Sequence, residues 1–297
     1  MRIGYACLTI GVPDTGIKSC IMKNASEAKL LELISHNLDS LENIIDYNIE
    51  NNIRLFRISS DLIPFGSSAI NKIPWWDLFR AEFLRIGQRI KDNGIRVSMH
   101  PGQYTVINSP NEVVVNRAID DLEYHSKVLD SLGVGKEHKI ILHIGGVYND
   151  KKSSVSRFVT SFCNLPIFIR DRIVLENDDK SYNICDALEI SAVLDVPVVF
   201  DNLHNEINPC DLEKSDAFWI NECKKTWKED DGIQKIHYSQ QDPAKRSGSH
   251  SDSIFLDKFL VFYNSLERDD IDIMLEVKDK NLSAVNCISS LSLEDTK

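Results

Sequence analysis

The sequence lacks any long apolar run. No hydrophobic stretch approaches the roughly 18 to 20 residues that a membrane-spanning helix needs. The N-terminal segment MRIGYACLTIGVPD shows no plausible signal-peptide cleavage site, and we interpret it as a first β-strand. Both absences favour a cytoplasmic protein without a membrane partner.

Cysteine is sparse and follows no pattern. The seven cysteines form an odd, scattered set without a C-x-x-C pair: Cys7, Cys20, Cys163, Cys185, Cys210, Cys223 and Cys287. A disulfide framework or a zinc ribbon would space its cysteines more regularly. We therefore expect reduced and mostly buried thiols, as in cytosolic proteins.

Two further absences limit the fold. The segment GYACLTIGVPDTG at the first predicted strand does not fit the G-x-G-x-x-G spacing with which doubly wound sheets bind dinucleotides. No Gly/Ser-rich linker or shift in composition divides the chain. We therefore expect one domain over residues 1–297, long enough to bury a full core.

Basic residues are too few for a nonspecific binder of polyanions. The chain has 34 Lys and Arg residues against 45 Asp and Glu residues, a formal net charge of −11. Divalent metals and a local basic rim can reverse this sign at one site, so a nucleic-acid enzyme is not excluded. The contents of 42% hydrophobic and 27% charged residues are ordinary for a globular enzyme and argue against disorder.

What the sequence does contain is a regular alternation of short β-branched runs and longer amphipathic ones. Strands are predicted at 2–8, 54–60, 95–100, 139–145, 172–177, 196–201, 234–239 and 272–277. Helices are predicted at 26–52, 77–93, 112–132, 153–169, 181–194, 211–228, 252–267 and after 281, with Ser26, Ser181 and Asp252 as candidate N-caps. Eight such units match a (β/α)8 TIM barrel of the α/β class.

Histidines and single carboxylates gather at the ends of the predicted strands. In such a barrel, the C-terminal ends of the strands meet at one face, where active sites lie. Five of the eight histidines and three carboxylates fall there: His100, His143, Glu176, Asp201, His204, His237, His250 and Glu276. So many ionisable groups in one cavity are costly to bury unless they are paired or bound to metal.

This set of imidazoles and carboxylates suits Mn²⁺, Zn²⁺ or Fe²⁺ in a catalytic site. Eight ligands exceed the needs of one ion, so we expect two or three divalent ions, an arrangement that hydrolyses phosphodiesters in many enzymes. Lys235 lies two residues before His237 and therefore on the same face of its strand. A bare ammonium beside metals would be repelled, so we expect Lys235 to be neutral, carboxylated as a bridging ligand, or paired with Glu276 or Asp201.

The loop that follows His100 carries a Gln-Tyr pair. Turn chemistry explains Pro101 and Gly102 but not Gln103 and Tyr104. A Gln amide can bond to orphaned bases of a distorted duplex, and a Tyr ring can stack on a base with roughly 1 to 3 kcal/mol. The simpler interpretation is a surface turn with an incidental tyrosine.

Seven segments occur in order along the chain: MHPGQY, LHIGG, LENDD, VVFDNLHN, KIHYSQQ, SGSHSD and MLEVKDKN. Together they resemble the UV damage endonuclease family, and the resemblance extends from RIGYACL to KDKNLSAV. It implies a metal-dependent (β/α)8 barrel, related to apurinic endonucleases of the endonuclease IV type and to xylose isomerase. It also implies an enzyme that nicks duplex DNA immediately 5′ to cyclobutane dimers, 6-4 products and some other lesions, leaving a 3′-hydroxyl.

The resemblance also assigns roles to residues. The family's metal ligands correspond to the eight strand-end residues named above, and its strand-7 lysine corresponds to Lys235. Manganese is the favoured ion, with Zn²⁺, Mg²⁺ and Fe²⁺ as alternatives. We expect catalysis to depend on Glu176, Lys235, His143 and Glu276.

For DNA, the lesion-probing pair of the family corresponds to Gln103 and Tyr104, and Tyr5 matches a family tyrosine in the first strand. Some members carry an asparagine shortly after that tyrosine, whereas this chain has Leu8, Thr9 and Ile10. Basic residues near the predicted metal site are expected to contact phosphates without reading sequence: Lys245, Arg246, Lys278 and Lys280.

Three function classes remain in competition. A DNA-repair endonuclease would be a monomer with an open face for damaged double-stranded DNA, cytoplasmic and nucleoid-associated when it acts. A metal-dependent sugar isomerase would have a small closed pocket and fewer ligands. A noncatalytic DNA- or metal-binding barrel would not need so many ligands, and an apurinic endonuclease is a variant of the first class. The number of ligands and the Gln-Tyr loop favour the DNA-repair endonuclease.

Overall fold

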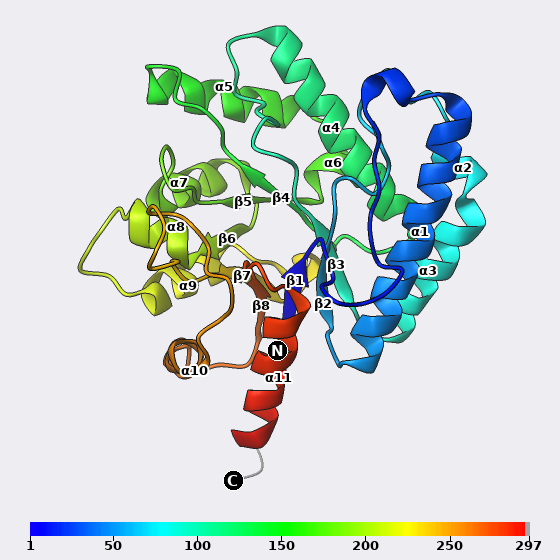
Figure 1. Ribbon diagram of the computed structural model, residues 1–297. Coiled ribbons are helices and arrows are strands. Elements are labelled where there is room, and N and C mark those ends of the chain that lie inside the picture. Colours follow the sequence, from blue (N-terminus) through cyan, green and yellow to red (C-terminus); the bar gives the residue numbers. More distant parts are fainter. Residues whose placement is uncertain (295–297) are drawn as a thin grey trace.

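The computed structural model of the protein describes residues 1–294 (Figure 1). Within them, eight parallel strands form a closed barrel in chain order, and β8 pairs with β1 to close it. The strands are β1 (Arg2–Ala6), β2 (Leu55–Ile58), β3 (Arg96–Met99), β4 (Ile140–His143), β5 (Ile173–Glu176), β6 (Val198–Asp201), β7 (Gln234–Tyr238) and β8 (Ile271–Leu275). The (β/α)8 barrel is therefore confirmed, and each predicted strand overlaps one observed strand.

Helices surround the barrel (Figure 1). They are α1 (Glu27–Glu50), α2 (Trp75–Leu78), α3 (Arg80–Asp92), α4 (Glu112–Ser131), α5 (Lys151–Asn164), α6 (Ile167–Arg170), α7 (Ile184–Leu194), α8 (Asn202–Ile207), α9 (Asp216–Lys224), α10 (Leu256–Ser265) and α11 (Asn281–Glu294). Single-turn 3₁₀ helices cover Met22–Asn24 and Glu229–Asp231. The short helix α8, directly after β6, was not predicted. Across residues 1–294, we find no helix with the length and apolar character to cross a bilayer.

The predicted helix caps are confirmed at one of three positions. The Ser26 hydroxyl accepts a hydrogen bond from the Lys29 amide at the start of α1. At α7 the prediction of Ser181 was wrong, because Asn183 forms a capping box with Asp186. At α10 the prediction of Asp252 was also wrong: the helix begins later, at Leu256, and the Asp252 carboxylate pairs with Lys278 instead.

Strand alternation separates the outer core from the barrel interior. Tyr5 and Phe56 face outward and pack edge to face, with ring centroids 5.2 Å apart. Their neighbours Ala6 and Leu55 form a separate apolar cluster with Met274. The wall therefore buries apolar residues on both faces, as expected for a parallel barrel.

Charged residues occupy the barrel near the N-terminal ends of the strands. The Arg96 guanidinium lies 3.0 Å from the Asp272 carboxylate, which also pairs with Arg2 at 3.1 Å. The buried Lys139 ammonium pairs with Asp231 and donates to the Asp171 carbonyl. Each of these buried charges has a partner of opposite sign, as burial requires.

The cysteines correct one expectation. Cys185 at the start of α7 and Cys210 after α8 form a disulfide with Cα atoms 6.1 Å apart. The prediction that all thiols are reduced is therefore wrong for this pair, whose proximity depends on the packing around α7 and α8. Of the free cysteines, Cys223 and Cys287 are buried as expected, whereas Cys163 is exposed.

Candidate metal centre

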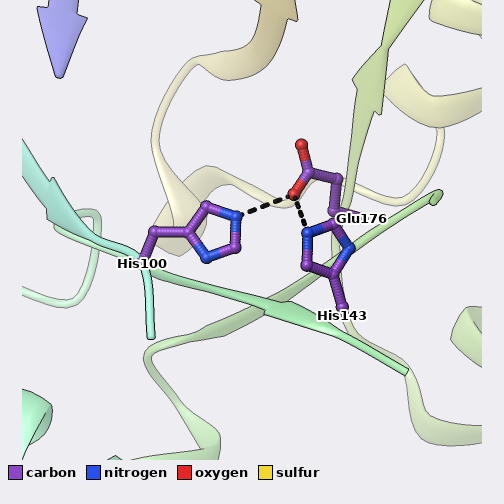
Figure 2. A group of neighbouring side chains, drawn as sticks. All are labelled: His100, His143 and Glu176. Atoms are coloured by element: carbon purple, nitrogen blue, oxygen red, sulfur yellow. Dashed lines mark hydrogen bonds and ion pairs between the residues drawn. The ribbon is translucent and has the colours of Figure 1, made fainter. Parts of the chain in front are cut away.

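Three predicted ligands meet at the C-terminal ends of adjacent strands. His143 and Glu176 are the last residues of β4 and β5 and face each other in register, and His100 directly follows β3. Figure 2 shows both imidazoles directed at one oxygen of the Glu176 carboxylate. The Nε2 atoms of His100 and His143 lie 3.0 Å and 3.3 Å from Glu176 Oε2. This group can hold a divalent cation.

A second group shares the same glutamate. Ligand atoms of Glu176, Asp201, His237 and Glu276 all lie within 4.8 Å of one another. His237 Nδ1 contacts Glu176 Oε1 and lies 3.2 Å from Glu276 Oε1. The two oxygens of Glu176 therefore face different histidines, and this carboxylate lies between two candidate metal positions.

The two remaining predicted ligands lie at the margins of these groups. His204 is on α8, whose first turn is capped by the Asp201 carboxylate, and its Nδ1 lies 3.8 Å from Asp201 Oδ1. His250 is in the loop after β7, and its Nε2 lies 3.9 Å from Glu276 Oε2. The structure thus places six of the eight predicted ligands in the two groups, with His204 and His250 beside them.

Electrostatics favours a bound cation. Burial alone would raise the pKa of Glu176, but the histidines His237 and His143 hold the pKa well below its usual range. Burial raises the pKa of Asp201. It would lower the pKa of His204, yet Asp201 and two further carboxylates raise that pKa to about 9. Burial lowers the pKa of His100 to about 4, so this imidazole is neutral and able to ligate a metal.

Several buried polar atoms of the predicted ligand residues lack a protein partner. Within residues 1–294, His143 Nδ1, Asp201 Oδ2 and His237 Nε2 have no hydrogen-bond partner. Buried polar atoms without a protein partner are rare and costly, and they are typical of sites that bind an ion or ordered water. Imidazole and carboxylate donors fit a hard or borderline divalent ion. The residues present therefore suit the predicted metals.

Lys235 is fully buried in β7, two residues below His237. Burial lowers the pKa of Lys235 far below its ordinary value, and the neighbouring Arg96 acts in the same direction. Among residues 1–294, its Nζ has no hydrogen-bond partner. Lys235 therefore forms no ion pair with Glu276 or Asp201 within these residues, which was one of the predicted alternatives. The lowered pKa favours the neutral amine.

The Gln-Tyr loop projects from this centre. Gln103 and Tyr104 are exposed, and 72% of the Tyr104 side chain is accessible. The loop is anchored behind them, where the Thr105 hydroxyl donates to the buried Asp121 carboxylate at 2.6 Å. Gln103 also lines a cavity of about 390 Å³ together with His143 and His204. The loop therefore adjoins the candidate metal ligands.

The other residues that were predicted to contact DNA differ in their exposure to solvent. Tyr5 is fully buried, and its hydroxyl bonds to Thr9 and Asn48 at 2.8 Å and 2.9 Å, because strand alternation directs it toward α1. In this arrangement Tyr5 does not reach the surface. Arg246 is exposed, whereas Lys280 is half-buried, and its pKa is lowered by burial.

Lys245 and Lys278 lie beside the centre but are paired within the protein. Lys245 lies 2.8 Å from Asp242 and 3.5 Å from Asp252, and Lys278 lies 2.7 Å from Asp252. A phosphate would have to compete with these two carboxylates. The loops therefore place both lysines near the candidate metal centre, but the ammonium groups are already paired with carboxylates.

Arg57 was missed in the sequence. It lies in β2, is 8% exposed, and its Nη1 lies 2.6 Å from Glu276 Oε1. The available signal was an arginine between two apolar residues of a buried strand, in the segment LFRI. Such a residue is expected to find a buried carboxylate.

The comparisons with known proteins agree with one another. The family model described as UV-endonuclease UvdE matches residues 1–296. The chain is 48% identical over 295 residues to the UV DNA damage endonuclease of Clostridium perfringens, covering 98% of this chain and 71% of that protein. It is 32% identical to the UV DNA damage endonuclease of Bacillus cereus strain Q1, covering 98% and 95%.

Solved structures are similar as well. The crystal structure of SacUVDE superposes with a TM-score of 0.94 at 39% identity and covers 99% of both chains. Endonuclease IV from Thermus thermophilus gives a TM-score of 0.61 at 11% identity, covering 97% of this chain and 99% of that chain. The second likeness shows a common fold alone.

Proposed function

The chain belongs to the UV-endonuclease UvdE family, and we propose on this premise that it nicks duplex DNA immediately 5′ to UV photoproducts. The proposed lesions are cyclobutane dimers and 6-4 products, and the proposed reaction is phosphodiester hydrolysis with two or three divalent ions, Mn²⁺ foremost. We further propose that residues 1–297 act as one domain, as a monomer, in the cytoplasm.

The position of Glu176 carries the proposal. One of its oxygens faces His100 and His143, and the other faces His237. A carboxylate directed to two ligand groups is the element from which a two-metal centre is built. Metal ions in such a centre lower the pKa of a bound water and stabilise the charge of the leaving oxygen.

We assign the remaining ligands by their contacts. His100, His143 and Glu176 would hold one ion, and Asp201, His237 and Glu276 would hold another with Glu176. His204 and His250 lie beside Asp201 and Glu276 and would complete these shells. Glu176, His143 and Glu276 are thus proposed to act in catalysis by fixing the ions around the scissile phosphate.

Lys235 is proposed to act through its uncharged form. A buried neutral amine can form a carbamate with carbon dioxide, releasing a proton and converting a potential cation into an anionic ligand. Burial and the unpartnered Nζ support this proposal over a permanent ammonium.

Lesion recognition is proposed for the exposed loop. Gln103 can bond to unpaired base edges, and the Tyr104 ring can stack on a base where the duplex is opened. Phosphates would contact Arg246 directly, Lys245 and Lys278 after rearrangement of their own contacts, and Lys280 from its half-buried position. A contact between Tyr5 and DNA would require its buried hydroxyl to be released.

The test is incubation of the protein and Mn²⁺ with a duplex that contains one defined cyclobutane dimer. We expect a single nick immediately 5′ to the dimer and no nick in the presence of EDTA. Matched duplexes with a 6-4 product, an abasic site or no lesion serve as controls. Equal cleavage of the undamaged duplex would refute lesion specificity, and cleavage of the abasic duplex alone would make the protein an apurinic endonuclease.

A further inference from the structure

Arg57 brings a fixed positive charge to the metal centre from a strand that supplies none of the predicted ligands. It is the third residue of β2, in register with Ala6 of β1 and Ser98 of β3. Its side chain is 10% exposed and points into the barrel, where Nη1 lies 2.6 Å from Glu276 Oε1. A guanidinium remains charged in proteins and cannot ligate a metal, so this contact constrains Glu276 permanently.

The contact distinguishes the two oxygens of Glu276. Oε1 accepts from Arg57 and lies 3.2 Å from His237 Nδ1. Oε2 faces His250 Nε2 at 3.9 Å, a distance too long for a hydrogen bond. One oxygen is therefore held by the protein, while the other and the His250 imidazole face each other across a gap.

Arg96 shows what a structural arginine looks like in this barrel. Its Nε donates to the Glu137 carbonyl at 2.8 Å, its Nη1 lies 3.0 Å from Asp272, and its Nη2 donates to the Asp231 carbonyl at 2.8 Å. Arg57 is also buried, but within residues 1–294 its Nε has no partner. The hydrogen bond of the Arg57 side chain thus goes to Glu276, whereas Arg96 is bound by several separate residues.

We propose that Arg57 is a positioning residue that acts through Glu276. It orients the carboxylate so that Oε2 alone, together with His250, is offered to a divalent cation, and its own charge offsets part of the repulsion among Glu176, Asp201 and Glu276. Outer-shell partners of this kind commonly change metal affinity by about 10- to 100-fold. The inference depends on the proposed function only in requiring a divalent ion, and its readout is metal binding.

The experiment titrates the metal-free, full-length protein with Mn²⁺ and follows free Mn²⁺ by its electron paramagnetic resonance signal. For Arg57→Gln we expect one class of sites to weaken by about 10- to 100-fold. Arg57→Lys keeps the charge but not the planar fork and should weaken the same sites less. Arg85→Gln is the matched control, because Arg85 forms an exposed pair with Glu42 between α3 and α1. It should bind Mn²⁺ like the unmodified protein.

A double-mutant cycle with Glu276→Gln separates positioning from general stabilisation. If Arg57 acts through Glu276, Arg57→Gln should change Mn²⁺ affinity by less than about threefold once Glu276 is already changed. Unchanged affinity in Arg57→Gln, or an undiminished loss in the Glu276→Gln background, would overturn the proposal. Should Arg57→Gln not fold, judged by circular dichroism, Arg57→Lys takes its place, and unchanged affinity there would overturn it equally.

Nicking assays give a second readout. Excess Mn²⁺ should restore part of the lost nicking in Arg57→Gln, because the reaction needs the ion and not the guanidinium itself. Failure of the unmodified protein to nick any duplex would refute the proposed function. The affinity changes would still decide the role of Arg57.

Discussion

The two ends of the barrel interior hold buried charges in opposite ways. Near the N-terminal ends of the strands, Arg96 pairs with Asp272 and Lys139 pairs with Asp231. At the C-terminal ends, Glu176 is shared by three histidines, and Asp201 Oδ2 and His237 Nε2 have no partner within residues 1–294. Arg96, Asp272, Lys139 and Asp231 at the first end satisfy one another, whereas the charges at the second form an incomplete ligand set. The first arrangement supports the fold, and the second is suited to a cation.

The largest effect is expected from Glu176→Gln. The substitution keeps the shape of the side chain but removes the carboxylate that lies between both ligand groups. We expect nicking of dimer-containing duplex to fall by more than about 100-fold, since loss of a ligand should exceed loss of an outer-shell partner. Binding of damaged duplex, measured by fluorescence anisotropy, should largely remain. Substantial residual nicking would contradict the central place of Glu176.

The opposite end is tested by Asp272→Asn. This change leaves Arg96 buried without its carboxylate partner, a defect that typically costs about 3 to 5 kcal/mol in the free energy of unfolding. Lys224→Gln is a matched control, because Lys224 pairs with Asp270 at the surface, where both side chains are half exposed. Its cost should stay below about 1 kcal/mol. Urea unfolding measures both, and nicking per folded molecule should change in neither.

The raised pKa of His204 predicts that the stability of the metal-free protein depends on pH. The pKa of His204 is raised from 6.5 to about 9 by Asp201, Glu176 and Glu276, although burial opposes the rise. A raised pKa means that the folded state binds the proton more tightly, so this stabilisation is complete below pH 6.5 and is lost as the pH rises to about 9. We expect a decrease of up to about 3 kcal/mol over this window.

His204→Gln should remove this decrease. Saturating Mn²⁺ should also remove it, because a metal-bound imidazole carries no proton at the ligating nitrogen. Urea unfolding in matched buffers measures the effect. A stability that is flat over this window in the metal-free, unmodified protein would contradict the assignment.

A smaller effect, on the recognition of damaged DNA, is expected from changes in the exposed Gln-Tyr loop. Replacing both Gln103 and Tyr104 by alanine removes the exposed tip of the loop but none of its anchors, such as Thr105 with Asp121. The preference for damaged over intact duplex should fall by roughly 1 to 3 kcal/mol, the value of one base-stacking contact. Competition binding with both duplexes measures it, and Mn²⁺ affinity should be unchanged. Undiminished preference would show that other residues recognise the lesion.

The sequence was sufficient for the fold and for most of the candidate centre. The strand pattern predicted the barrel, and the barrel places every strand end at one face, so His143, Glu176 and Asp201 could be located from their positions alone. The exposed tip at Tyr104 followed from the Pro-Gly turn before it.

Other features depend on three-dimensional contacts that no spacing reveals. Tyr5 was expected to contact DNA, but the alternation of β1 directs it into the layer between barrel and helices. The Cys185–Cys210 disulfide and the contact of Arg57 with Glu276 each join segments whose distance is set by packing. Lys245 and Lys278 were recognised as basic residues near the centre, but their pairing with Asp252 required the folded loops.

The number of ions per chain tests the central claim that the C-terminal end of the barrel is an incomplete ligand set. The measurement is equilibrium dialysis of the full-length protein and of Glu176→Gln against Mn²⁺, with metal content determined by mass spectrometry. We expect at least two ions per chain in the unmodified protein, because two ligand groups share Glu176. Glu176→Gln should hold at least one ion fewer. Fewer than two ions in the unmodified protein, or an unchanged number in Glu176→Gln, would contradict the account.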